Sequence, residues 1–89
     1  MCRNIRPLYN YDPPATEQEI RAAALQYVRK ISGYQRPSKV NDAAFNLAVA
    51  EIARVSGELL ASLITTVPAR DREAEAQRAR ARTAKRFGR

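Results

Sequence analysis

The C-terminal end of the chain carries the residues with the clearest chemical potential. Residues 76–89 hold six cations and no acid, whereas residues 1–75 hold ten basic and nine acidic residues. The six cations are Arg78, Arg80, Arg82, Lys85, Arg86 and Arg89. Four of them follow an i, i+4, i+7, i+11 spacing, which places them on one stripe of a helix. Guanidinium groups bind phosphates well, so this pattern favours a helix that contacts the phosphate backbone of a nucleic acid.

Two other interpretations of this basic tail stay open. An alanine-rich basic segment can bind an acidic protein surface, or it can be a solvated tail that contacts nothing. Membrane binding is disfavoured, because the tail has a single large apolar residue, Phe87, and so lacks the apolar face that enters a bilayer interface. The whole chain also lacks an apolar stretch of roughly 20 residues, the length of a membrane span.

Cys2 is the second residue that could do chemistry. If the initiator methionine is removed, its thiol lies beside the α-amino group, with Arg3 and Arg6 close in sequence. Cationic neighbours increase the reactive thiolate fraction of a thiol. Three roles remain open: an incidental or packing thiol, a modified or sensing thiol, and the nucleophile of a minor enzyme.

The rest of the composition excludes most enzyme chemistry. The 89 residues include no histidine and a single cysteine, so a histidine base, a Cys–His pair and a disulfide framework are all impossible within the chain. We therefore expect no metal and no cofactor and assign no catalytic residue; the composition favours a non-enzymatic protein, and an enzymatic role stays open only through Cys2. The first residues contain no apolar run of signal-peptide length, which favours a cytoplasmic location.

The first helix has the clearest boundaries in the sequence. Prolines at positions 7, 13 and 14 predict an extended arm over residues 1–15 that covers part of the helices. Thr16 and Glu19 have the spacing of a capping box, and Gly33 suits the left-handed residue that ends a helix. Apolar residues at helical spacing between them predict a helix over residues 17–32.

A second, longer helix follows the connection at residues 35–38. Ser38 or Asn41 is the expected N-cap, and the helix should end near Thr65–Thr66, shortly before Pro68. Its apolar face comprises Phe45, Ala48, Val49, Ile52, Val55, Ser56, Leu59, Leu60 and Leu63. Its polar face carries a charge ladder of Glu51, Arg54 and Glu58. Gly57, inside this helix, is either simply tolerated or marks a close approach by the arm or the first helix, and the apolar-face position of Ser56 beside it favours the close approach.

These elements predict an all-α fold: an antiparallel helical hairpin covered by an extended N-terminal arm, plus a basic C-terminal helix. Pro68 is the expected start of that last helix, so the chain divides into an arm (1–15), a hairpin core (16–67) and a basic helix or tail (68–89). Sixteen of the residues are alanine, so the core is thin. A homodimer that buries the second helix against its mate would compensate.

Three stretches of the chain carry a resemblance. They are MCRNIRPL at the start, PPAT followed two residues later by EIRAAALQYVRK at the first helix, and the alanine- and arginine-rich tail that ends in AKRFG. In these stretches the sequence resembles a family of short bacterial proteins of unknown function. The resemblance implies a bacterial cytoplasmic protein and brings no activity, cofactor or catalytic residue.

Overall fold

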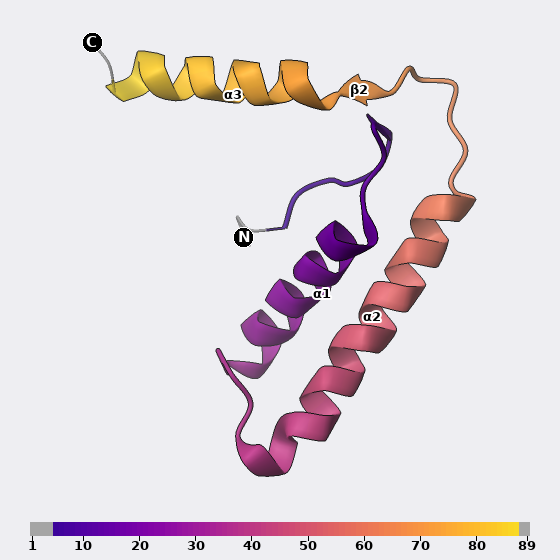
Figure 1. Ribbon diagram of the computed structural model, residues 1–89, viewed down its shortest axis with the longest axis vertical. Helices are drawn as coiled ribbons and strands as arrows, with labels where there is room; N and C mark the ends of the chain where they lie inside the picture. The colour runs from indigo at the N-terminus through magenta and orange to yellow at the C-terminus, as the bar shows by residue number, and fades with distance from the viewer. Residues whose placement is uncertain (1–4, 88–89) are drawn as a thin grey trace.

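A computed structural model describes residues 5–87, with side chains up to residue 83. Two helices, α1 (Glu17–Ser32) and α2 (Asp42–Ser62), form an antiparallel hairpin, and a third, α3 (Arg72–Phe87), crosses its open end (Figure 1). The predicted all-α fold is confirmed. Within the described residues the strands are limited to two pieces, β1 (Tyr11–Asp12) and β2 (Arg70–Asp71), which pair in parallel.

Helix α1 has the ends that its sequence predicts. The Thr16 side chain accepts a hydrogen bond from the Glu19 backbone N–H at 3.1 Å, and the Glu19 carboxylate accepts one from the Thr16 backbone N–H at 2.8 Å. This reciprocal capping box satisfies two N–H groups that a helix start leaves without partners. At the other end Gly33 has a φ of 78°, and its N–H donates to the Arg29 carbonyl at 2.9 Å. A left-handed glycine therefore ends the helix.

Helix α2 begins after a predicted N-cap residue, Asn41, but without a side-chain capping bond, and it ends earlier than predicted. A short 3-10 turn, η1 (Lys39–Asn41), leads into it, and the Asn41 side chain donates to the Ser38 hydroxyl instead of accepting from a helical N–H. The helix ends at Ser62, three residues before the expected Thr65, because Leu63 already has extended geometry. Residues 63–69 then form an extended linker, which carries the chain across to β2.

The hairpin core is small. Its buried side chains are Ala24, Val28, Phe45 and Val49, with Leu25, Ala48, Ile52 and Ala53 packed against them. The arm covers only one end of the hairpin, where Leu8 and Tyr9 lie over Ile20 and Leu60 around a groove of about 370 Å³. The arm therefore covers only part of the hairpin.

Gly57 does not mark the tight contact that its position suggested. A β-carbon built there would meet the Ile20 side chain at 4.0 Å, which is an ordinary van der Waals distance. The charge ladder, in contrast, forms as predicted: Arg54 pairs with Glu51 at 3.0 Å and with Glu58 at 3.1 Å.

Helix α3 begins at Arg72, four residues after the expected start at Pro68. The reason is that Arg70 and Asp71 pair with β1 as a strand before the helix begins. Asp71 then caps the helix, since its carboxylate accepts the Ala74 backbone N–H at 3.0 Å. From there α3 runs across the open end of the hairpin without packing lengthwise along α1 or α2 (Figure 1).

Candidate functional site

The candidate site lies where the N-terminal arm meets the start of α3. Asn10 joins the two segments: its carbonyl accepts the Arg70 backbone N–H at 2.8 Å, and its side-chain amide donates to the carbonyls of Val67 and Pro68. Asn10 has a φ of 66°, and asparagine is one of the few residues besides glycine that adopts this geometry readily. The backbone of the arm is thereby turned to meet the linker.

Arg72, the first residue of α3, fixes the helix to the start of α1. Its guanidinium forms a two-pronged pair with the Glu19 carboxylate, at 2.9 and 2.7 Å, and its Nε donates to the Pro13 carbonyl at 2.6 Å. The hydrogen bonds from the Arg72 guanidinium, followed by the one from the Thr16 backbone N–H, lower the pKa of Glu19 from 4.5 to about 2. The same pair raises the pKa of Arg72. The Arg72 guanidinium is therefore occupied by its contacts with Glu19 and with the arm.

Tyr11 lies between two arginines of the tail. The Arg70 guanidinium lies 5.2 Å from the centre of the ring and donates a hydrogen bond to the phenolic oxygen at 3.1 Å. The Arg72 guanidinium lies 5.7 Å from the same ring. Both contacts are within cation–π range, so the ring orients two cations at once.

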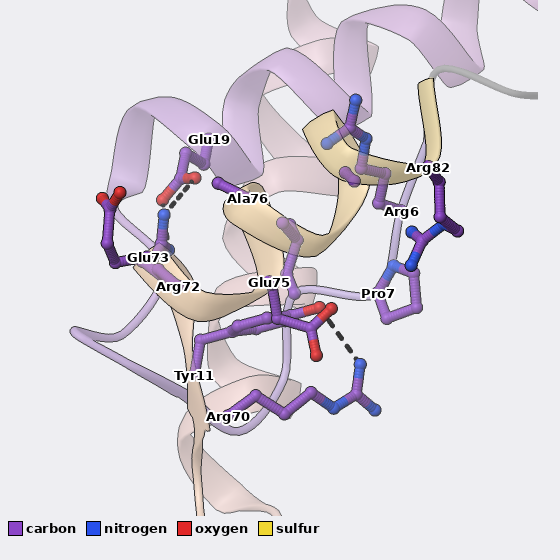
Figure 2. Close-up of a pocket in the computed structure, with 12 residues that line it drawn as sticks. Arg6, Pro7, Tyr11, Glu19, Arg70, Arg72, Glu73, Glu75, Ala76 and Arg82 are labelled. Carbon is purple, nitrogen blue, oxygen red and sulfur yellow. Dashed lines mark hydrogen bonds and ion pairs between the residues drawn. The ribbon is translucent and has the colours of Figure 1, made fainter. Parts of the chain in front are cut away.

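An open cleft of about 760 Å³ lies between the arm and α3 (Figure 2). Its charged lining residues are Arg6, Arg70, Arg72, Arg82, Glu19, Glu73 and Glu75. Each of these three acids has a cation as its partner: Glu19 pairs with Arg72, Glu73 with Arg80 at 3.5 Å, and Glu75 with Arg78 at 2.8 Å.

The three remaining arginines of the cleft give it a positive excess. Arg6, Arg70 and Arg82 have no acidic partner among the residues whose side chains the structure describes. Figure 2 shows these three side chains around the same hollow. The cleft can therefore accept an anion without first breaking an ion pair.

A family model described as "Uncharacterized conserved protein (DUF2277)" matches residues 1–78. The chain belongs to the DUF2277 family. The match covers the arm, the hairpin and the junction with Arg70 and Arg72, and it ends before Arg80 and Arg82. The predicted membership of a family of unknown function is thus confirmed. No curated protein and no solved structure matches the chain.

In this DUF2277 chain, the cationic residues of the predicted stripe and its flanks differ in the contacts that they make. Arg78 and Arg80 are each engaged by an acid one or two turns earlier in α3, whereas Arg82 lines the cleft. The α3 backbone continues past Lys85 and Arg86, but their side chains lie outside the described residues, as do Arg89 and Cys2 altogether. The expected stripe through Arg78, Arg82, Lys85 and Arg89 is therefore described only in its first half.

The junction residues were missed by the sequence analysis of this DUF2277 chain. Tyr11 and Arg70 are 59 positions apart in the sequence, and no local pattern indicates that the two meet. Glu19 was identified only as half of a capping box, which is a role that it does have. In the described part of the chain, no group of acids and cysteines has the arrangement of a metal site. Within the same residues, no helix is long and apolar enough to cross a membrane.

Proposed function

We propose that this protein is a non-enzymatic, cytoplasmic, nucleic-acid-associated protein that binds phosphate backbones through its tail and the adjoining cleft. The observation that carries the proposal is the set of arginines without an acidic partner: Arg6, Arg70 and Arg82. They adjoin the stretch from residue 82 to 89, which contains four cations and no acid.

The attachment of α3 supports this proposal physically. A phosphate contact contributes most when its cation is already positioned, because less side-chain and backbone freedom is lost on binding. The junction at Asn10, Glu19 and Tyr11 holds the start of α3, so the cationic end projects as a helix from a fixed base. Alanines between its arginines leave the backbone free to approach a groove.

Charge reversal of the tail tests the proposal. The variant Arg82→Glu, Lys85→Glu, Arg86→Glu lowers the formal net charge from +7 to +1. A matched control, Lys30→Glu, Arg36→Glu, Lys39→Glu, changes the charge equally at exposed sites near the far end of the hairpin. Fluorescence anisotropy with a short labelled duplex and a single strand should show a loss of roughly tenfold or more for the tail variant only.

Salt dependence provides the second half of this test. With four phosphate contacts, the logarithm of the binding constant should fall against the logarithm of salt concentration with a slope of about −3 to −4 for duplex DNA. Sequence preference should be weak, since arginines on phosphates carry little base information. Equal losses of affinity in both charge variants would rule out the tail as a phosphate-binding element. The same conclusion would follow if the wild type does not bind at about 0.15 M salt.

An acidic protein surface is the second candidate partner. The cleft combines its arginines with the apolar side chains of Pro7 and Leu8 from the arm, a mixture that suits a protein surface better than bare phosphates. Absence of nucleic-acid binding, with retention of a specific acidic protein in a pull-down that needs Arg82, would favour this candidate.

The hypothesis of a thiol-based sensor or minor enzyme rests on Cys2, which lies outside the described residues. It stays a prediction. A rate of alkylation by iodoacetamide that titrates below about 8.5, the value of a free thiol, would support it.

A further inference from the structure

The cleft between the arm and α3 is lined by apolar groups as well as by cations. Pro7 and Leu8 line it from the arm, and Ala76 and Ala79 line it from α3. Its volume of about 760 Å³ is within the range of sites that hold small ligands. A ligand that fills this cleft therefore needs apolar surface as well as negative charge.

Tyr11 and Arg70 together give the cleft a planar, cationic surface. The Arg70 guanidinium lies 5.2 Å from the centre of the Tyr11 ring and donates to its phenolic oxygen at 3.1 Å, so the ring holds the guanidinium in place. Arg70 is exposed, and it has no acidic partner among the side chains that the structure describes. Nucleic-acid bases stack on guanidinium planes as they do on aromatic rings.

A single strand can use both kinds of surface, whereas a duplex can use only the charges. The bases of a duplex are stacked and paired in its interior, so their faces are covered. An unpaired strand presents base faces and phosphates together, and it bends to follow a groove. Phosphate contacts alone favour the duplex, because it has the higher charge density and releases more counterion per contact.

We infer that the cleft binds single-stranded nucleic acid in preference to duplex, with phosphates on Arg6 and Arg82 and a base against the Tyr11–Arg70 pair. Figure 2 shows Arg6 and Arg82 along one side of the cleft and Tyr11 with Arg70 along another. The residues after Arg82 carry three further cations to which the strand can extend. This inference rests on the proposed function and names the form of nucleic acid that is recognised.

An acidic peptide is the competing occupant of the cleft. Its carboxylates would pair with the same arginines. The side chains of aspartate and glutamate offer no extended planar ring to the Tyr11–Arg70 pair, so the single strand is the better match to the whole lining.

Fluorescence anisotropy of the full chain with matched probes tests the inference. The probes are a labelled thymidine strand of about twelve nucleotides, its duplex with the complementary strand, and a uridine strand that separates RNA from DNA. The better of the two single strands should bind about fivefold or more tightly than the duplex. An abasic strand of the same length keeps the phosphates and loses the bases, so it should bind about fivefold or more weakly than the thymidine strand.

Arg70→Lys separates the planar group from its charge. Lysine keeps the cation but has no plane on which a base can stack, so the preference for single strand should fall towards one while duplex affinity stays within about twofold. Arg36→Lys is the matched control, because Arg36 is exposed in the connection between α1 and α2 and should leave the preference unchanged. Circular dichroism checks that both variants are folded. If Arg70→Lys is not, the abasic strand with the wild type decides.

The outcomes distinguish this inference from the proposed function. Duplex binding as tight as single-strand binding, or equal binding of the abasic and thymidine strands, would overturn the inference and leave phosphate binding by the tail intact. No binding of any nucleic acid at about 0.15 M salt would overturn both. A glutamate oligomer that binds more tightly than the single strands would overturn the inference and assign the cleft to an acidic protein.

Discussion

The carboxylate of Glu19 accepts hydrogen bonds from the backbone of Thr16, three residues before it, and from the guanidinium of Arg72, 53 residues after it. One side chain therefore closes the N-terminus of α1 and also fixes the start of α3. The local bond belongs to the secondary structure and the distant one to the tertiary structure. Substitutions at this position can separate the two roles.

Glu19→Gln and Glu19→Ala should differ in a defined way. Glutamine can still accept the Thr16 N–H, but it loses the charge-assisted pair with Arg72, whereas alanine loses both. Trypsin should therefore cleave after Arg70 and Arg72 faster in both variants, while the denaturation midpoint should fall further in Glu19→Ala. Glu17→Gln is the control, because Glu17 is also an acid in the first turn of α1 and makes no bond to Arg72. Cleavage at the wild-type rate in Glu19→Gln would mean that the pair does not hold α3.

Acid should open the junction at an unusually low pH. The pKa of Glu19 is about 2 in the folded chain and 4.5 in its ordinary state, so its stabilising contribution is complete above 4.5 and is lost as the pH falls through about 2. The difference in melting temperature between wild type and Glu19→Gln should be constant above pH 4.5 and should disappear near pH 2. A difference that persists unchanged at pH 2 would contradict an ionic origin.

Replacing Gly57 and Gly33 by alanine should have opposite effects on the free energy of unfolding. Gly57→Ala should raise the free energy of unfolding by about 1 kcal/mol, because the site is helical and a β-carbon there meets only Ile20 at 4.0 Å. Gly33→Ala should lower it by about 1 to 2 kcal/mol, because Gly33 has a φ of 78°. Chemical denaturation measures both. If Gly57→Ala instead lowers the free energy of unfolding, Gly57 does make the close contact that the sequence suggested.

Truncation after Pro68 should leave a folded hairpin. All four buried side chains belong to α1 and α2, so the core survives without β2 and α3. The arm should loosen, since Asn10, Tyr11 and Pro13 lose their partners in the tail. We expect a cooperative melt by circular dichroism at a lower temperature than that of the full chain. An unfolded truncated chain would show that the proposed division at residue 68 is wrong.

The sequence by itself determined the features that act within one or two helical turns. The capping box at Thr16 and Glu19, the left-handed end at Gly33 and the ladder around Arg54 are formed by neighbours a few residues apart. Such contacts follow from the helix period, so the residue types and their spacing suffice to predict them. The all-α fold and the bounds of α1 were predictable for the same reason.

Only the tertiary structure decided how the tail meets the arm and which cations keep acidic partners. The pairing of Tyr11 with Arg70, and of Glu19 with Arg72, depends on the path of the linker after α2, which no local pattern encodes. The late start of α3 has a related cause, because strand pairing of Arg70 with β1 competes with helix formation. A spacing pattern shows which side chains share a helix face. Whether another segment then covers that face depends on contacts between residues that are distant in the chain.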